Sequence, residues 1–165
     1  MKSNVIIIAA MAHDGVIGRD NKMPWNIPEE LESFKQITTS HNVVMGKNTY
    51  QSIGKILPNR NNYILTSDRS FQVSGANIVH GFGEMMFELL SKPDEKFYVI
   101  GGKTIFDQFL ALAGRLIISE IDLRCNGHIY FPKLNYKNWK LVEEIEIKNL
   151  QNIKIIQKHY ERVYF

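Results

Sequence analysis

Hydrophobic residues occur along the chain in short runs separated by polar segments, and this alternation predicts strands and helices in turn. The first run, Val5–Met11, is apolar throughout, as expected for a strand covered on both faces. Shorter apolar runs predict further strands at 42–45, 62–66, 76–79, 96–100 and 115–121. Helices are predicted from Pro28 to about 39, after Gly46 to about Ile53, and over 83–90 and 104–112.

The C-terminal part predicts a long hairpin, with strands at 139–147 and 153–165 around a turn at 150–152. Strands that alternate with helices form a mostly parallel sheet with helices on both faces. We therefore predict an α/β fold: a mixed, mostly parallel sheet of eight strands, about four helices and a C-terminal antiparallel hairpin. With 165 residues, the chain has the length of one domain, spanning 1–165.

Composition and charge exclude several classes of protein. Hydrophobic residues make up 44% of the chain and charged residues 22%, as in globular proteins, and no apolar run approaches the roughly 18 residues of a membrane span. Basic residues exceed acidic ones by only 20 to 17 and are scattered, unlike a nucleic-acid-binding tract. The single Cys125 has no partner for a disulfide, and the five histidines are too far apart in the sequence to suggest a metal site. We expect a cytoplasmic protein with no nucleic-acid or membrane partner.

Two predicted strands run into helices through glycine, VMGKNT at 44–49 and VIGGKT at 99–104. A helix N-terminus offers unpaired N–H groups to phosphate, and glycine lets a ligand approach the backbone. Either junction alone is more often a simple tight turn, but the pair moves the balance toward the grip of a dinucleotide. Phosphate-loop and GxGxxG motifs are absent, since Phe97 and His41 stand where a phosphate loop has its first glycine. The long connection at 12–27 is also typical of a functional segment.

An acidic residue, Glu30, lies among apolar ones near the start of the helix that begins at Pro28. Leu31 and Phe34 are expected to form the apolar face of this helix, and Trp25 lies just upstream. A carboxyl group beside such side chains loses hydration, which raises its pKa and suits it to proton transfer near neutral pH. The spacing alone, however, favours a solvated carboxylate that interacts with the helix dipole.

Four segments of the chain match one family in order and spacing. They are IIIAAM…GVIGRDNKMPWNIPEELESFK at 6–35, VVMGKNTYQSIGKILPNRNNYILTS at 43–67, VIGGKTIFDQFL at 99–110 and LIISEID…YFP at 116–132. The chain resembles the dihydrofolate reductases of the ordinary chromosomal type over nearly its whole length, and MPWN–PEEL together with VIGG is highly specific. The resemblance implies reduction of 7,8-dihydrofolate to 5,6,7,8-tetrahydrofolate with NADPH, for one-carbon metabolism. It also implies a monomer that binds antifolates of the trimethoprim type.

The resemblance implies catalytic roles for Glu30, which supports protonation of pterin N5 through water, for Trp25, which orients that water, and for Ser119, which joins the pterin–acid network. Many bacterial members have Asp where this chain has Glu30. Arg60 matches the arginine that pairs with the substrate α-carboxylate, a role suited to a planar guanidinium. The full set of substrate-binding positions is Ile8, Ala10, Glu30, Leu31, Phe34, Lys35, Ile53, Leu57, Arg60, Ile100 and Ser119.

The cofactor-binding positions implied by the resemblance fall on the loop after the first strand, at the two glycine junctions and after the strand at 62–66. They are Ala10, Ile17, Gly18, Asn21, Met23, Gly46, Lys47, Asn48, Thr49, Leu65, Thr66, Ser67, Ile100, Gly101, Gly102, Lys103, Thr104, Ile105 and Phe106. The stretch 18–25 matches a mobile loop that closes over the nicotinamide and excludes water. Lys47 is the cation expected at the 2′-phosphate, while Thr104 and Phe106 stand where some members have Arg and Tyr.

Two other functions compete with a folate reductase. A pyrimidine reductase of riboflavin synthesis is similar in fold but needs neither the PWNIPEEL acid nor the LPNR arginine, so those residues argue against it. A nucleotide-binding module without catalysis would bind the cofactor with no turnover.

Overall fold

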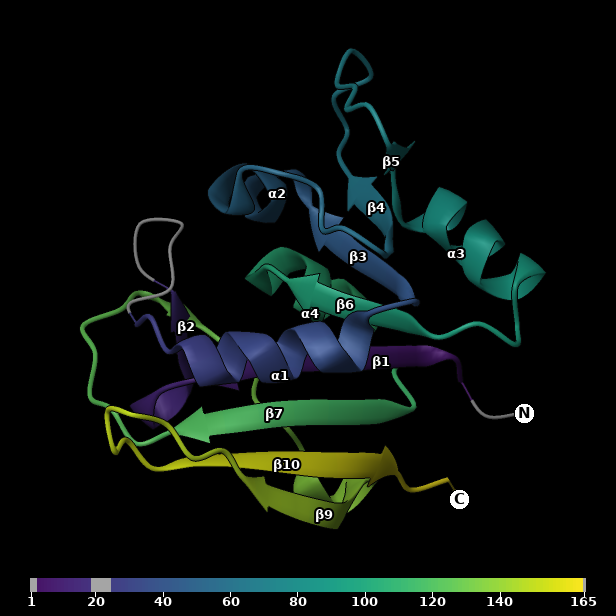
Figure 1. The fold of residues 1–165 in the computed structure, drawn as a ribbon. Coiled ribbons are helices and arrows are strands. Elements are labelled where there is room, and N and C mark those ends of the chain that lie inside the picture. The colour runs from purple at the N-terminus through teal and green to yellow at the C-terminus, as the bar shows by residue number, and fades with distance from the viewer. Residues whose placement is uncertain (1–2, 19–24, 165) are drawn as a thin grey trace.

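The computed structural model describes residues 3–18 and 25–164, and most of its strands form one 8-stranded sheet in the order β5-β4-β3-β6-β1-β7-β10-β9 (Figure 1). From β5 to β7 all neighbours pair in parallel, whereas β10 is antiparallel to both β7 and β9. The predicted mixed, mostly parallel sheet with a C-terminal antiparallel hairpin is thus confirmed. The strands are β1 (Val5–Met11), β3 (Asn42–Gly46), β4 (Asn61–Leu65), β5 (Ala76–Val79), β6 (Phe97–Gly101), β7 (Arg115–Ile121), β9 (Trp139–Glu146) and β10 (Ile155–Arg162).

Helices cover both faces of the sheet, as the alternation of strands and helices predicts. They are α1 (Pro28–Thr38), α2 (Lys47–Ile53), α3 (Phe82–Ser91) and α4 (Lys103–Phe109). Side chains alternate between the faces along each strand, so Val5 and Ile7 of β1 pack on the side of α3 and α4, whereas Ile6 packs on the side of α1. The longest described helix has 11 residues, and none of the described helices has the length and apolar character needed to cross a bilayer.

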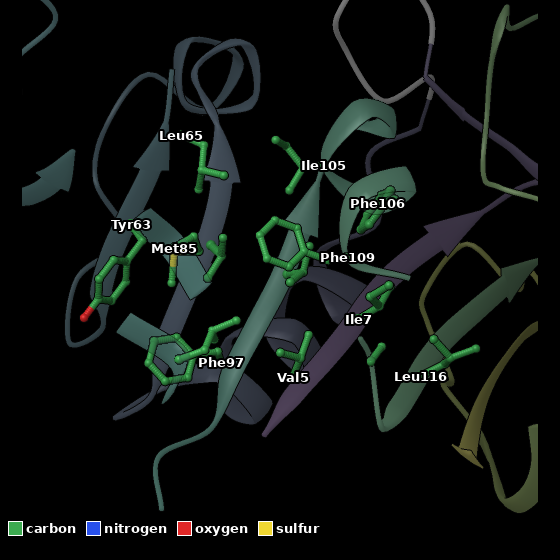
Figure 2. Packing of buried hydrophobic residues seen from close by; sticks show 14 of the residues in the cluster. Val5, Ile7, Tyr63, Leu65, Met85, Phe97, Ile105, Phe106, Phe109 and Leu116 are labelled. Atoms are coloured by element: carbon green, nitrogen blue, oxygen red, sulfur yellow. The ribbon is translucent and has the colours of Figure 1, made fainter. Parts of the chain in front are cut away.

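The larger hydrophobic core lies between the sheet and helices α3 and α4. Figure 2 shows side chains from β1, β4, β6 and β7 meeting those of the two helices there. Phe97 of β6 and Phe109 of α4 are fully buried, and Phe109 also packs against Phe82, with the ring centroids 5.2 Å apart. Burial of such large aromatic side chains supplies much of the stability of the fold.

A smaller apolar cluster lies on the opposite face of the sheet, beneath α1 and α2. Half-buried side chains pack against it, among them Phe34 of α1, Leu57 and Ile100. The cluster is therefore partly open to solvent near Ile100, at the carboxyl end of β6. Its buried members are Ile6, Ile8, Val43, Met45, Ile64, Tyr98 and Ile117.

Helix α1 buries the face that contains Phe34, Ile37 and Thr38, as predicted, but with Glu30 on it in place of Leu31. Its buried residues are Glu30 and Thr38, and Phe34 and Ile37 are half-buried. These four positions follow the spacing of one helical stripe, i, i+4, i+7 and i+8. Leu31 lies about 100° around the helix from Glu30 and is 45% exposed. The expectation that Leu31 packs on the buried face beside Phe34 is therefore wrong.

A second, two-stranded sheet joins β2 (Val16–Gly18) to β8 (Ile129–Tyr130). The sequence predicts only irregular chain there, because strands of three and two residues leave no alternating pattern. Gly127 permits the close approach of the two segments, since a Cβ atom at this position would lie 2.8 Å from the carbonyl oxygen of Gly18.

Element boundaries also differ from the predicted ones. β6 includes Gly101, which the sequence predicts as part of a turn, and α4 ends at Phe109 rather than at 112. The N–H groups of Leu112 and Ala113 both donate to the Phe109 carbonyl oxygen, so the chain leaves α4 in a turn. Two 3₁₀ helices that the sequence does not predict are η1 (His13–Gly15) and η2 (Tyr136–Asn138).

Replacing Phe109 with Ala should lower the free energy of unfolding by about 3–5 kcal/mol, because a fully buried ring would leave a cavity in the larger core. Phe87→Ala is the matched control: Phe87 is 71% exposed on α3, and its loss should change the free energy by less than about 0.5 kcal/mol. Chemical denaturation followed by circular dichroism measures both values. Equal losses for the two variants would contradict this assignment of the core.

Candidate active site

The carboxyl ends of the parallel strands meet along one edge of the sheet, where α2 and α4 begin and α1 has its first turn (Figure 1). Proteins of the α/β class bind ligands at such an edge, because helix N-termini and strand-end loops converge there. The ends of β1, β3, β6 and β7 therefore define the candidate site.

Strands β3 and β6 are neighbours, so their glycine junctions lie side by side at this edge. A Cβ atom at Gly46 would lie 3.1 Å from Cγ1 of Ile105, and one at Gly102 would lie 3.4 Å from the hydroxyl oxygen of Thr49. Gly101 has a φ of 131°, a conformation that favours glycine, and its peptide bond to Gly102 is cis. Each junction thus packs against the helix that follows the other, and a side chain at either glycine would crowd the space between them.

Lys47, at the start of α2, pairs with Asp68, an acidic residue that is not among the predicted site residues. Its Nζ atom lies 3.2 Å from Oδ2 of Asp68 and 4.9 Å from the centre of the Phe71 ring. The Asp68 N–H donates to the Thr66 hydroxyl oxygen at 3.1 Å. Hydrogen bonds from the Ser70 hydroxyl and N–H, with Lys47, lower the pKa of Asp68 to about 2. Asp68 therefore contacts both Lys47 and Thr66 and brings them close together. The sequence Thr-Ser-Asp directly after β4 could have indicated this polar cluster.

The other positions assigned to the cofactor divide between core and surface. Lys103 turns back along its own helix, with Nζ 3.2 Å from Oδ2 of Asp107. Asn21 and Met23, and with them most of the predicted lid at 18–25, lie outside the described residues. Leu65, Ile105 and Phe106 are buried, Ile17 and Gly18 belong to β2, and the exposed positions are Asn48, Ser67, Lys103 and Thr104.

Glu30 is almost fully buried, with 8% of its surface exposed, in the first turn of α1. Pro28 opens the helix, and helical spacing turns Glu30 toward the sheet together with Phe34. Burial raises the pKa of the Glu30 carboxyl from 4.5 to about 7. The prediction from spacing alone, that Glu30 is a solvated carboxylate, is therefore wrong. A carboxyl group with a pKa near neutral pH lies at the edge of the sheet where the parallel strands end.

Trp25 and Ser119 both lie near Ala10, at the carboxyl end of β1. Trp25 is half-buried and packs in a small cluster with Ala10, Ile27 and Ile121. Its buried indole N–H finds no acceptor among the described residues. Ser119 of β7 is paired with Ala10 and is 3% exposed. The structure thus brings both predicted partners of Glu30 to the carboxyl end of β1.

Arg60 is held in place by the turn that precedes β4. The amide side chain of Asn62 closes this turn, accepting from the Leu57 N–H at 2.8 Å and donating to the Leu57 and Arg60 carbonyl oxygens at 2.8 and 3.1 Å. The Arg60 guanidinium donates from Nε to Pro58 O at 2.9 Å and from Nη1 to Thr38 Oγ1 at 3.0 Å. The contacts of Asn62 and Thr38 with this turn and with Arg60 were not predicted, since a hydrogen bond between side chains or to the backbone leaves no periodic signal in the sequence.

Several apolar positions predicted to bind substrate belong to the smaller cluster. Ile8 is buried, and Phe34, Leu57 and Ile100 are half-buried within it. The remaining positions lie at the rim: Leu31 is 45% exposed, Ile53 is 37% exposed, and Lys35 is exposed.

A cavity of about 310 Å³ lies elsewhere, between η1 and strands β7 and β10, and shares no lining residue with the substrate positions. Two pairs of polar side chains lie along its lining. His13 Nε2 lies 2.6 Å from Asp122 Oδ1, and Lys158 Nζ lies 2.5 Å from Glu120 Oε2. Because the chemistry that the sequence singles out is at the strand edge, we place the candidate site there. Within residues 3–18 and 25–164, no three His, Cys, Asp or Glu side chains gather as metal ligands would.

A family model described as dihydrofolate reductase matches residues 4–162. Two relatives named dihydrofolate reductase come from Staphylococcus aureus (strain Mu50 / ATCC 700699) and Bacillus subtilis (strain 168). The first is 37% identical over 140 residues, covering 84% of this chain and 85% of the relative. The second is 37% identical over 138 residues, covering 84% and 81%.

Among solved structures, a dihydrofolate reductase from Enterococcus faecalis complexed with NADP(H) and RAB-propyl is similar to this chain. The TM-score is 0.86 at 28% sequence identity, over 97% of this chain and 96% of that one. Sequence and structure agree, and the match extends across both glycine junctions, α1 and the C-terminal hairpin. The chain therefore belongs to the dihydrofolate reductase family, whose members are NADPH-dependent enzymes.

Proposed function

We propose that the protein reduces 7,8-dihydrofolate to 5,6,7,8-tetrahydrofolate with NADPH, acts as a single-domain monomer and supplies tetrahydrofolate for one-carbon metabolism. The observation that carries this proposal is the buried carboxyl of Glu30, with a pKa of about 7, at the same sheet edge as two opposed glycine junctions. Reduction of a C=N bond adds one hydride and one proton, so it requires a proton source beside a dinucleotide.

The glycine junctions fit a dinucleotide. Gly46 and Gly102 leave the main chain bare where α2 and α4 begin, so phosphate oxygens would accept hydrogen bonds from the backbone N–H groups there. Lys47 and Thr66 both contact Asp68, and we assign these two residues to the 2′-phosphate of NADPH. When bound, NADPH supplies the hydride for pterin C6.

Glu30 holds the proton for the other half of the reaction. Because burial raises its pKa to about 7, roughly half of the molecules carry this proton at neutral pH, whereas an ordinary glutamate is almost wholly ionised. The buried indole N–H of Trp25 is suited to hold a water molecule through which Glu30 protonates pterin N5. Ser119 lies on the same face of the sheet as Ile117 and adds a hydroxyl group beside this path.

We assign the substrate α-carboxylate to Arg60. Its hydrogen bonds to Pro58 and Thr38 fix the guanidinium at the end of α1, and a planar fork of N–H donors matches a carboxylate. The apolar positions between Arg60 and Glu30 would form the walls for the pterin and benzoyl rings. These walls are Ile8, Ala10, Leu31, Phe34, Ile53, Leu57 and Ile100.

The decrease in the absorbance band of NADPH after dihydrofolate is added to the purified chain tests the proposed reaction. We expect turnover with NADPH, slower turnover with NADH, and inhibition by trimethoprim that competes with dihydrofolate. Cofactor binding without turnover would indicate a nucleotide-binding module. No oxidation of NADPH by a folded sample would overturn the proposal.

Glu30→Gln should lower the rate of dihydrofolate reduction by about 100-fold or more near pH 7, because an amide does not supply the proton. The loss should be smaller at acid pH, where solvent acid replaces part of the missing donor. In the unchanged protein the rate should fall as pH rises through about 7, because the carboxyl must be protonated to act. Rate profiles against pH at saturating NADPH measure both effects.

Glu32→Gln is the matched control for Glu30, since Glu32 is exposed on the same helix. This variant should keep both the rate and the pH profile of the unchanged protein. Unchanged kinetics in Glu30→Gln would remove Glu30 from its role.

Arg60→Leu should raise the Michaelis constant for dihydrofolate by about 10- to 100-fold, the value of a lost charge-assisted hydrogen bond, and leave that for NADPH within about twofold. Steady-state kinetics with each substrate varied in turn measure the two constants. Arg69→Leu, an exposed arginine outside the turn, serves as the control. An equal rise in both constants for Arg60→Leu would contradict its assignment to the carboxylate.

A further inference from the structure

Hydrogen bonds between polar side chains connect α1 to β10. The amide Nε2 of Gln157 donates to the hydroxyl oxygen of Ser33 at 3.0 Å. The other end of the same amide, Oε1, lies 2.8 Å from Nε2 of His159. Gln157 is 4% exposed and His159 is 8% exposed, so both are buried. His159 is paired with Ile117, so both lie on the sheet face that packs on the side of α1.

The hydrogen bonds from His159 through Gln157 to Ser33 all run in one direction. An amide oxygen only accepts, so Nε2 of His159 must carry the proton and donate it to Gln157. Burial lowers the pKa of His159, which keeps the ring neutral and leaves Nδ1 as a buried acceptor with no partner among the described residues. The amide of Gln157 is therefore fixed by the imidazole on one side and presents its N–H group to α1 on the other.

The bridge reaches α1 next to the candidate proton donor. Ser33 lies three residues after Glu30, one helical turn along the same side of α1. On the strand side, Gln157 is paired with Ser119 of β7. The two ends of α1 are tied elsewhere, by the Leu150 N–H that donates to Glu29 Oε2 at 2.7 Å and by the bond from Arg60 to Thr38. Gln157 thus ties the middle of the helix to the sheet.

We propose that Gln157 is a positioning residue for the protonation of substrate: its amide, fixed by His159, ties Ser33 to β10 and thereby keeps Glu30 seated against the sheet. The proposal rests on the proposed function for its link to catalysis, since Gln157 acts through Glu30. Loss of the bridge leaves a buried amide N–H unpaired, and water that enters to satisfy it would also hydrate Glu30.

Besides His159 itself, the charged groups that act on the bridge come from the two strands beside β10. They are Arg115 on β7 and Glu143, opposite His159 on β9, and Arg115 also interacts with Tyr98 of β6. The raised pKa of Glu30 has burial as its cause and not any of these charges. A change in the seating of α1 should therefore act on Glu30 through its hydration.

Ser33→Ala removes only the helix end of the bridge and is the variant least able to disturb folding. The titration of the Glu30 carboxyl carbon, followed by ¹³C NMR in the folded protein without ligands, should move about half a pH unit toward acid. That shift lowers the protonated fraction at pH 7 about twofold. Ser33→Thr, which keeps a hydroxyl, should restore the midpoint. Gln157→Leu should shift it in the same direction as Ser33→Ala.

Gln36→Leu is the matched control, because Gln36 is exposed on α1 and, among the residues that the structure describes, its side chain hydrogen-bonds only along the helix to Glu32, at 3.4 Å. It should leave the midpoint of Glu30 unchanged. An equal midpoint in Ser33→Ala and Gln36→Leu, even with a lower melting temperature in the former, would overturn the proposal and leave the bridge a purely structural feature.

The rate profile against pH then links the bridge to catalysis. In Ser33→Ala the midpoint of dihydrofolate reduction should shift as far as the NMR midpoint, with the Michaelis constant for NADPH unchanged. An NMR shift in a protein that does not reduce dihydrofolate would mean that the proposed function has failed while the seating of Glu30 by Gln157 stands. An NMR shift with an unmoved rate profile in an active enzyme would overturn the catalytic part of the proposal.

Discussion

The burial of one carboxyl group beneath helix α1 is the constraint on which the candidate site depends. A buried carboxylate is costly, and the group lowers that cost by taking up a proton, so burial itself creates an acid with a pKa of about 7. A leucine at position 30 would have packed on the sheet more readily, and the exposed Leu31 is the residue that the helix turns outward instead. Burial of Glu30 thus lowers the stability of the fold and gives it an acid suited to neutral pH.

The order of the strands in the sheet brings the other parts of the candidate site together. Strands β3 and β6 are distant in the sequence but adjacent in the sheet, and so their glycine junctions meet. In the same way, parallel pairing of β1 with β7 sets Ser119 beside Ala10, next to the first turn of α1. The larger core on the far face, between the sheet and α3 and α4, holds these strands in register (Figure 2). The site therefore inherits its geometry from a sheet whose stability comes mainly from the opposite side.

Much of this architecture could be predicted from sequence, because strands covered on both faces leave continuous apolar runs such as Val5–Met11. The small β2–β8 sheet could not, since two or three residues show no period. The burial of Glu30 was misjudged from spacing because periodicity ranks residues by hydropathy, whereas its neighbours on the helical stripe, Phe34 and Thr38, carry it inward. The motifs of the family resemblance pointed to the carboxyl where periodicity did not.

The residues that hold the site in place were the hardest to foresee. Asn62, Asp68 and Gln157 each join parts of the chain through a few hydrogen bonds. Gln157 and Ser33 are 124 positions apart, and no local pattern reports such a contact. Predicting the contact between Gln157 and Ser33 requires knowing the strand order first.

The pairing of Lys47 with Asp68 bears on how strongly this chain attracts negative charge. With the two side chains already 3.2 Å apart, the ammonium group meets an arriving anion as half of an existing ion pair. To bind the anion, Lys47 exchanges one anionic partner, Asp68, for another. The net electrostatic gain is therefore the difference between two interactions and not the full strength of one. Asp68 therefore weakens the attraction of Lys47 for an anionic ligand.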